Sequence, residues 1–315
     1  MVDRLWSATE SFWEALASIH WAPFLAAIGL HVAKLGCTSR AWRNVLAAAY
    51  PEQRVRWHKI FGAYVAGVGV NAIVPARAGD VVRVYLAHRA IPTSSYTTIV
   101  SSTIVLTFVD VAFALAVYAW VLTQGVLPDL DVLPSLPTFD YWWLVENPRW
   151  TAVLVGIAAA GLIALVVWAH RRWREFRERV AQAFAVLHPK TRYLRTVAAW
   201  QVLDWGLRLA MIWCFLGAFG IEQSLRNVLL VQASQSLATL IPATPGGIGT
   251  EQALLVYVFR GADIARSTLL AFSVGMKLTL TAVNVVLGFA AIFLSLGTFR
   301  YGKATRPREP DAPPA

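Results

Sequence analysis

A proline and a glycine interrupt an apolar stretch near residue 75, and polar side chains stand on both sides of this first break. Pro75 removes a backbone donor and Gly79 relaxes the backbone, so a helix that ends here should restart around Asp80. The first turn of a helix offers unpaired N–H groups, which beside two arginines make a site for an anion such as a lipid phosphate. The plainer interpretation is that the arginines reach the headgroups while the acid only caps its helix. The polar side chains of the first break are Asn71, Arg77, Asp80 and Arg83.

A second break, at residues 241–251, is richer still in residues that end helices. Two prolines and three glycines fall within it, so this backbone cannot continue as helix and is too costly to expose to lipid. It should therefore be buried in protein or line a cavity. Thr250 and Glu251 then open a return helix, where the carboxylate is expected to pair with a basic residue of the first break or to hold a proton or cation. A structural salt bridge is the alternative. The other residues singled out in this break are Pro242, Thr244, Pro245, Gly246, Gly247 and Gly249.

Ionisable residues also lie inside otherwise apolar stretches. An unpaired charge at the bilayer centre costs about 2.5 to 3.5 kcal/mol, so each of them should have a partner or face a wet cavity. Asp204 and Arg208 are spaced i, i+4 and are expected to satisfy each other as a structural pair. The others are His31, Lys34, Asp110 and Lys277.

Two polar stripes follow the period of a helix. If both faced inward, they would line a hydrophilic path through the protein, whereas hydrogen bonds in helix interfaces are the alternative. One stripe consists of Lys277, Thr281 and Asn284, and the other of Thr103, Thr107 and Asp110.

Motifs of soluble catalysis are missing from the sequence. It contains no H-E-x-x-H, no G-x-S-x-G and no Cys/His cluster, and no Lys-Ser/Thr follows the glycines of the second break as a nucleotide loop requires. Asp129 and Asp131 form a D-x-D, but they lie in a predicted outer loop, away from cytosolic sugar nucleotides. We therefore expect no enzyme activity, no cofactor and no metal site.

The composition is that of a membrane protein. Of the 315 residues, 57% are hydrophobic and 15% charged, and the mean hydropathy is +0.54. Soluble domains are about 45 to 50% apolar. The net charge of +10 fits cytoplasmic loops beside anionic lipid and does not indicate a nucleic-acid partner. The apolar stretches are Trp21–Cys37, Ile60–Val74, Tyr96–Leu122, Thr151–Ala169, Thr196–Phe219, Val228–Ile241 and Thr268–Leu296.

Length and charge together predict the topology. The stretches that precede the two breaks reach only roughly 21 to 23 Å, against a hydrocarbon core of about 30 Å. The basic segments are 40–59, 171–195 and 300–308, and the acidic one is 125–150. All basic segments can be cytoplasmic only if both short stretches enter and leave on one side. We predict five full spans and two re-entrant hairpins, the first from inside and the second from outside, with the N-terminus outside and the C-terminus cytoplasmic. Seven or more full spans are the alternative.

Opposed hairpins of this kind predict an all-α polytopic bundle built from an inverted repeat. Both breaks read proline, three residues, glycine and then an acid within two residues. Helical spacing of apolar residues over 171–187 indicates an interfacial amphipathic helix, or else a connecting helix packed on the bundle. The predicted layout is an N-terminal interfacial segment (1–20), a transmembrane domain (21–297) with halves 21–123 and 151–296 and a cytoplasmic linker 171–195, and a basic Pro-rich cytoplasmic tail (298–315).

The chain resembles the flippase-like family known as the lysylphosphatidylglycerol synthase transmembrane domain, which includes the flippase half of MprF-type proteins and the YbhN-like proteins. Residues 71–83 are similar to the family's N-x-x-x-P-x-R-x-G-E pattern, and residues 240–251 are very close to its second motif. The resemblance extends over residues 21–296. Departures from the family pattern are Asp80 in place of Glu, Leu106-Thr107 in place of Glu-Arg, and Lys277 in place of a frequent Arg.

The resemblance implies movement of a lipid or lipid-linked headgroup between the leaflets of a prokaryotic plasma membrane. It implies no synthesis, because aminoacyl transfer in the two-domain relatives resides in a separate soluble domain. The expected partner is an anionic, aminoacylated or polyprenyl-linked lipid, moved without ATP. The residues expected to bind its headgroup are Asn71, Arg77, Arg83, Thr244 and Lys277, with Asp80, Asp110 and Glu251 balancing charge. One alternative is a non-transporting subunit that presents a lipid-linked substrate to a glycosyl- or aminoacyltransferase. Another is an intramembrane transferase.

Overall fold

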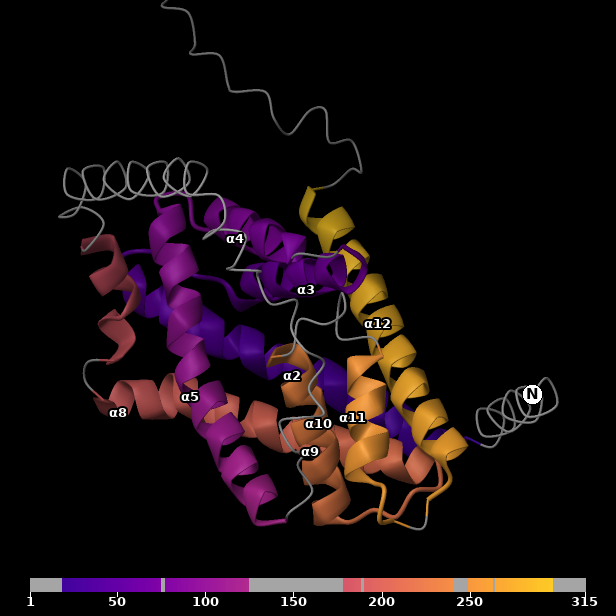
Figure 1. The fold of residues 1–315 in the computed structure, drawn as a ribbon. Helices are drawn as coiled ribbons and strands as arrows, with labels where there is room; N and C mark the ends of the chain where they lie inside the picture. Colours follow the sequence, from indigo (N-terminus) through magenta and orange to yellow (C-terminus); the bar gives the residue numbers. More distant parts are fainter. Residues whose placement is uncertain are drawn as a thin grey trace, which may run out of the picture.

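The computed structural model describes residues 19–74, 77–124, 178–187, 190–240, 249–262 and 264–296. Within these ranges the regular secondary structure is helical and includes no strand, which confirms the all-α prediction (Figure 1). The helices are α2 (Trp21–Ala49), α3 (Trp57–Ile73), α4 (Ala78–Ala90), α5 (Tyr96–Thr123), η2 (Ala185–Leu187), α8 (Lys190–Tyr193), η3 (Leu194–Ala198), α9 (Ala199–Ala218), α10 (Leu225–Leu240), α11 (Thr250–Val258) and α12 (Arg266–Leu296).

Three of the described helices, α2, α5 and α12, are long and apolar enough to cross a membrane. They contain three of the five predicted spans. The predicted span Thr196–Phe219 lies, except for its last residue, within an unbroken helical run over residues 190–218, made by α8, η3 and α9. The remaining one, Thr151–Ala169, lies outside the described residues, as do the predicted N-terminal segment up to residue 18 and the tail from residue 297.

Helix α2 extends well beyond the predicted span, which was expected to end at Cys37. It continues to Ala49 and carries Arg40 and Arg43 in its last turns. The reason is local, because residues 38–49 contain no proline or glycine and include four alanines and two arginines, which favour helix. The chain leaves the helix only at Tyr50, next to Pro51.

Two helix pairs form hairpins, and their first helices are short. Helix α3 has 17 residues and α10 has 16, or about 24 to 26 Å, so each is shorter than a hydrocarbon core of about 30 Å. Helix α3 packs on α4, and α10 packs on α11. In the first pair the backbones approach closely, since a Cβ built on Gly67 would lie 2.7 Å from the carbonyl oxygen of Gly79. The predicted short helices are confirmed, while residues 75–76 and 241–248 of the breaks lie outside the described residues.

The first hairpin lies against the C-terminal half of α12. A Cβ on Gly62 would lie 3.5 Å from the Ser295 hydroxyl oxygen, and a Cβ on Gly69 would lie 2.7 Å from the Cα of Gly288. Later residues of α3 therefore contact earlier residues of α12, so the two helices are antiparallel. The end of α3, where the first break begins, is directed toward the middle of α12.

The second hairpin lies against the N-terminal half of the same helix (Figure 1). Lys277 donates to Glu251 at 3.0 Å, and Gln252 donates to the Ser273 hydroxyl at 3.1 Å. These contacts make α11 antiparallel to α12 as well, with its first turn beside Lys277. Both hairpins therefore present the helix end next to their break to the central part of α12, residues 277–284.

Each hairpin belongs to a different cluster of buried apolar side chains. Ile60 of α3 and Leu86 of α4 lie in one cluster, and Leu230 of α10 and Leu255 of α11 lie in the other. Helices α2, α5 and α12 contribute to both clusters. The long helices thus connect two packing centres, and each centre holds one hairpin.

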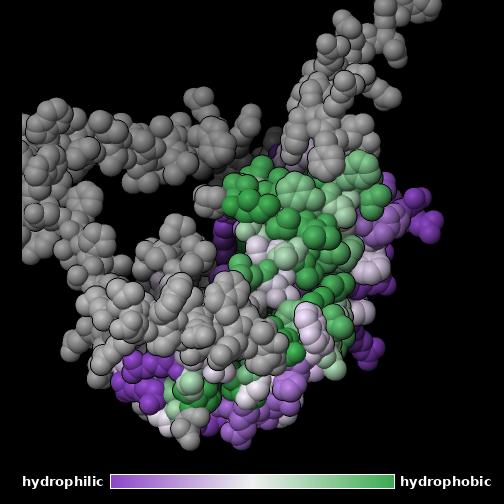
Figure 2. All heavy atoms as spheres, turned by 90° about the vertical axis from the view of Figure 1, so that its right-hand side faces the viewer, coloured by the Kyte–Doolittle hydropathy of each residue, from purple (hydrophilic) through white to green (hydrophobic). Residues whose placement is uncertain are grey.

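The outer face of α12 is apolar. Leu278, Val286, Phe289 and Leu294 are all exposed. Figure 2, which faces the side of the molecule on which α12 lies, shows hydrophobic residues gathered there. An exposed apolar surface of this kind suits contact with lipid chains.

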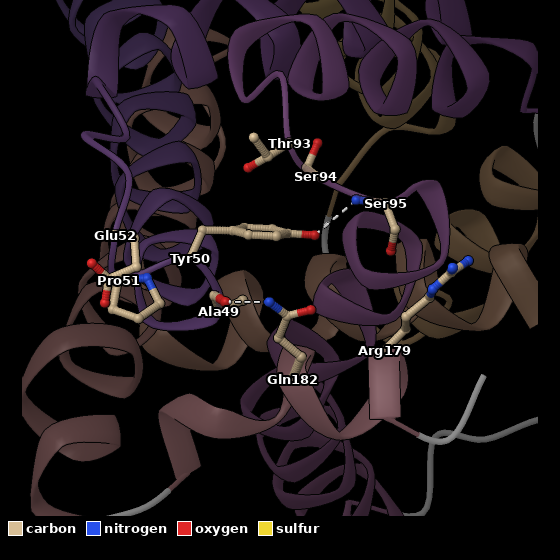
Figure 3. A pocket seen from close by; sticks show the side chains of 9 residues that line it. All are labelled: Ala49, Tyr50, Pro51, Glu52, Thr93, Ser94, Ser95, Arg179 and Gln182. Carbon is tan, nitrogen blue, oxygen red and sulfur yellow. Dashed lines mark hydrogen bonds between the residues drawn. The ribbon is translucent and has the colours of Figure 1, made fainter. Parts of the chain in front are cut away.

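The described part of the linker, residues 178–187, packs on the bundle. Val186 is buried in the first hairpin's cluster, and Gln182 donates to the carbonyl oxygen of Ala49 at 2.7 Å. Nearby, the Tyr50 hydroxyl accepts from the N–H of Ser95 at 2.9 Å, beside a surface pocket of about 520 Å³ (Figure 3). For these residues the structure favours a packed connecting helix over a helix that lies on the membrane surface.

Replacing Gly288 with alanine should destabilise the protein. The new Cβ would lie 2.6 Å from the Cα of Gly69 and force α3 away from α12. Overpacking of this kind costs about 1 to 3 kcal/mol. Thermal unfolding in detergent measures the effect. Gly29→Ala is the matched control, because its Cβ meets nothing within 4 Å and alanine favours helix. A Gly288→Ala protein that melts no lower than Gly29→Ala would contradict the described packing of α3 on α12.

Candidate functional site, a polar layer in the middle of the long helices

Each long helical segment carries an ionisable residue close to its midpoint. The midpoints fall at residue 35 in α2, between 109 and 110 in α5, at 204 in the 190–218 run and at 281 in α12. His31, Lys34, Asp110, Asp204 and Lys277 lie at most four residues, or about 6 Å, from these midpoints. We call this set and its bonded neighbours the mid-depth layer, which comprises His31, Lys34, Thr38, Asp110, Gln201, Asp204, Trp205, Arg208, Glu251, Lys277 and Asn284.

Hydrogen bonds join α12 to α2 and α2 to α9 within this layer. His31 Nε2 donates to the Asn284 amide oxygen at 2.8 Å, which fixes the proton on that ring nitrogen. The Thr38 hydroxyl donates to Asp204, whose other carboxylate oxygen lies 3.4 Å from Arg208. The predicted i, i+4 pair is therefore confirmed, with Asp204 4% exposed and the side chain of Arg208 28% exposed.

The same layer continues from α9 to α5. The Trp205 indole N–H donates to Asp110 at 2.9 Å, and the Gln201 amide donates to the carbonyl oxygen of Leu106. The Arg208 guanidinium stacks on the Trp205 ring at 4.6 Å. Asp110, which the sequence predicted to balance the charge of a headgroup, therefore accepts a hydrogen bond from the indole of Trp205. The layer runs without interruption across α12, α2, α9 and α5.

Asn71 organises the first break. Its amide oxygen accepts from the N–H of Gly79 at 2.7 Å, and its amide nitrogen donates to Asp80 at 3.2 Å. The N–H of Asp80 returns to the carbonyl oxygen of Arg77 at 2.9 Å. The return helix thus begins at Ala78, two residues earlier than predicted. The side chain of Asn71 and the backbone of the turn accept from two of the first N–H groups of the return helix. Anion binding at this helix end therefore depends mainly on the arginines.

The two arginines of this break lie in different surroundings. Arg83 pairs with Asp80 at 3.3 Å and lies over the rings of Trp42 and Tyr64, at 5.4 and 5.9 Å. It therefore points back into the bundle, which contradicts the interpretation that it reaches the headgroups. Arg77 is exposed and has a left-handed backbone conformation, with φ of 57°. For a residue with a side chain this conformation is strained, as is common where backbone geometry serves a site.

The second break brings Glu251 and Lys277 together at 3.0 Å. The glutamate is only 5% exposed, and its partner lies on α12, not on the first hairpin as one of the predictions had it. Gly249 precedes the return helix with φ of 89°, and its N–H is capped by the Gln252 side chain at 2.7 Å. The other residues singled out around the breaks lie outside the described residues, namely Pro75, Pro242, Thr244, Pro245, Gly246 and Gly247.

The two polar stripes behave differently. On α12, Lys277 contacts α11 and Asn284 contacts α2, so this stripe faces the bundle. On α5, Thr107 is exposed, and its hydroxyl donates to the carbonyl oxygen of Ile104 in its own helix. Thr107 therefore does not lie on the buried side of α5, and Thr103 is only half-buried. The buried face of α5 passes through Ser102 and Leu106, about 100° round the helix from Thr103 and Thr107.

Several residues of the layer were not singled out from the sequence, namely Thr38, Gln201 and Trp205. Each is a hydrogen-bonding side chain inside an apolar helix, which is the signal that would have identified it. The described residues hold no group of three or more His, Cys, Asp or Glu placed to bind a metal ion. What the layer offers chemically is therefore paired charge and hydrogen bonding.

Comparison with known proteins places the chain among membrane proteins. The family described as Lysylphosphatidylglycerol synthase TM region matches residues 5–288, a range that includes both hairpins and most of α12. The inner membrane protein YbhN of Escherichia coli (strain K12) is 22% identical over 298 residues, covering 91% of this chain and 82% of that protein. No solved structure matches significantly.

Glu251→Gln and Lys277→Met should be strongly coupled in stability. Removal of the lysine leaves a carboxylate in a buried position, which costs about 3 to 5 kcal/mol, whereas the double variant buries no such charge. A double-mutant cycle of melting temperatures in detergent measures the coupling. We expect Lys277→Met to melt lowest and the double variant to regain part of the loss. Additive effects would contradict a direct pair.

Proposed function

The chain belongs to the Lysylphosphatidylglycerol synthase TM region family, and from this membership and the mid-depth layer we propose that it is a lipid translocase. It moves the headgroup of a phospholipid or lipid-linked molecule between the leaflets of a prokaryotic plasma membrane, while the acyl tails remain in the bilayer. The observation that carries the proposal is the layer itself, which joins charged and hydrogen-bonding side chains across four long helical segments.

A charged headgroup that crosses the bilayer centre meets the same free-energy cost as a charged side chain placed there. One charge at the bilayer centre costs about 2.5 to 3.5 kcal/mol, so a phosphate and an amine together cost about 5 to 7 kcal/mol. This difference corresponds to roughly 10⁴- to 10⁵-fold in crossing rate. Side chains that replace water around both charges remove most of this barrier.

The members of the layer, taken together with Arg77 of the first break, divide into structural and available groups. Asp204 and Arg208 are committed to each other and to Thr38. Arg77 is exposed, and the side chain of Lys277 is 38% exposed, so these cations are open to a phosphate. In our proposal the phosphate takes the place of Glu251 on Lys277. The freed carboxylate then holds a proton, a cation or the amine of the headgroup.

The two hairpins provide the route in this proposal. Their break-side ends converge on residues 277–284 of α12 from opposite halves of that helix. We infer that they dip into the membrane from opposite faces as two halves of an inverted repeat, residues 21–123 and 151–296. The N-terminus then lies outside and the C-terminus inside. In this orientation the most basic end of the bundle faces the cytoplasm. That end carries Arg40, Arg43, Arg54, Arg56 and Lys59.

No nucleotide loop is present in the sequence, so the movement we propose is downhill or coupled to an ion. A headgroup shifts the equilibrium between partner arrangements only by its preference for one of them. The exchange of Glu251 for a phosphate on Lys277 supplies such a preference. It needs no large motion of the long helices.

Exchange of fluorescent headgroup-labelled phosphatidylglycerol between leaflets tests the proposal in reconstituted vesicles. We expect Arg77→Ala and Glu251→Gln each to lower the exchange rate at least about tenfold, the effect of about 1.4 kcal/mol of lost stabilisation. Arg260→Gln and Glu222→Gln are matched controls, because both residues are exposed and neither belongs to the layer or to one of the two breaks. Normal exchange in both test variants would defeat the assignment.

The same assay separates translocation from presentation. If purified wild-type protein shows no exchange but retains a membrane glycosyl- or aminoacyltransferase during gentle purification, the non-transporting role is favoured. Product formation by the purified chain with a soluble donor would instead indicate a transferase.

Cysteine labelling tests the proposed orientation. In a protein with Cys37 and Cys214 changed to serine, Thr93→Cys should react with a membrane-impermeant maleimide only from the cytoplasmic side. Glu222→Cys should react only from outside, since residues 93 and 222 are exposed at opposite ends of the bundle. Labelling of residue 93 from outside would rule out a hairpin that returns to the cytoplasm.

A further inference from the structure

A groove of about 630 Å³ lies between α3, α4 and α12 at one end of the bundle, where α3 begins and the other two helices end. Its walls are largely apolar and include Val65, Leu86, Leu287 and Leu294. The volume falls within the range of about 300 to 1,000 Å³ that small-molecule sites occupy. Because Leu294 is 81% exposed, the groove is open on the side that faces lipid.

Basic side chains stand at only one end of this groove. His58 and Lys59 belong to the first turn of α3, and Arg89 belongs to the last turn of α4. All three are exposed, and within the described part of the chain none of them forms an ion pair. The cations thus gather where the helices end, at headgroup level, while the apolar walls continue along α12.

An adjoining pocket of about 440 Å³ extends the positive charge. It shares His58 with the groove, and it is otherwise lined mainly by arginines that flank Trp57. These arginines are Arg40, Arg43, Arg54 and Arg56. Arg43 is fixed by its bond to the carbonyl oxygen of Val55 at 2.9 Å, and Arg40 stacks on the Trp57 ring at 5.8 Å. A group that enters the basic end of the groove therefore meets a strongly positive surface.

We propose that the groove binds one anionic diacyl phospholipid of the adjacent leaflet. An acyl chain lies between α3 and α12, and the phosphate lies between Lys59 and Arg89. From Leu287 to Ser295 the groove follows α12 for about 12 Å, close to the depth of about 15 Å of one hydrocarbon leaflet. The charge selects an anionic lipid, because each cation near the membrane surface strengthens the attraction to such lipids.

This site is separate from the mid-depth layer. Ser295, at the basic end of the groove, lies about 16 Å along α12 from Asn284, so the phosphate in the groove lies outside the proposed translocation route, and only the inner end of the acyl chain, at Leu287, comes near that level. It fills the space between the first hairpin and α12 and holds them together from the lipid side. The inference therefore goes beyond translocation and survives if no lipid crosses.

Binding of phosphatidylglycerol and phosphatidylcholine to the delipidated protein, measured by native mass spectrometry, tests the site. We expect one tightly held phosphatidylglycerol and a matching rise in melting temperature that phosphatidylcholine does not produce. Lys59→Gln/Arg89→Gln should weaken phosphatidylglycerol binding about thirtyfold. The control Arg226→Gln/Arg260→Gln removes the same charge from exposed positions elsewhere and should leave binding unchanged.

A second variant tests the apolar part of the groove. Ala290→Trp places a large ring among the lining residues and should displace the lipid, whereas Ala282→Trp adds the same ring to an exposed position of α12 outside the groove. Equal affinity for the two lipids, or unchanged binding in both the charge variant and Ala290→Trp, would overturn the proposal. If the protein binds phosphatidylglycerol as expected but shows no lipid exchange in vesicles, the result would contradict the proposed translocation and leave the groove proposal standing.

Discussion

A charge inside an apolar helix must be paired or hydrated, and hydrogen bonds that cross between the long helices partner several of the polar side chains in the mid-depth layer. His31 reaches Asn284, Thr38 reaches Asp204, and Trp205 reaches Asp110, so each contact ties one helix to the next. Apolar packing alone gives weak selectivity between helix neighbours in lipid, because the lipid chains are equally apolar. The polar layer therefore specifies which helices meet, and at what level.

Helix α12 is the common support of the two hairpins. Where a helix of 16 or 17 residues ends at a break and a return helix begins, the first N–H groups of the return helix have no partner within it and must find protein or water. The first hairpin solves this with Asn71, whose amide caps the return helix, and the second with Gln252, which caps Gly249. Close glycine contacts then seat α3 on α12. The broken segments are thus held by specific caps and contacts, so their ends stay near the centre of α12.

Two kinds of ionic contact coexist in this arrangement. The pair of Asp204 and Arg208 is largely enclosed and reinforced by Thr38 and the Trp205 ring, and exchange of its partners would leave a charge without compensation. The pair of Glu251 and Lys277 joins a buried carboxylate to a partly exposed ammonium group. The side chains of Arg208 and Lys277 are 28% and 38% exposed, so exposure alone distinguishes the two pairs only slightly. Basic residues at the helix ends form a third group, which lies outside the layer.

The sequence by itself determined the features that depend on neighbouring residues: helical structure, the two short helices that end at proline and glycine, and the i, i+4 pair of Asp204 and Arg208. The sequence also determined which residues share a helix face. It did not determine which way that face points, because packing sets the rotation of a helix, and Thr103 and Thr107 lie off the buried side of α5. Only the tertiary structure decided that Glu251 pairs with Lys277 and His31 with Asn284, residues 26 and 253 positions apart. Such pairs depend on how each helix is rotated and how closely backbones approach, as Gly69 and Gly288 do, and sequence spacing carries neither quantity.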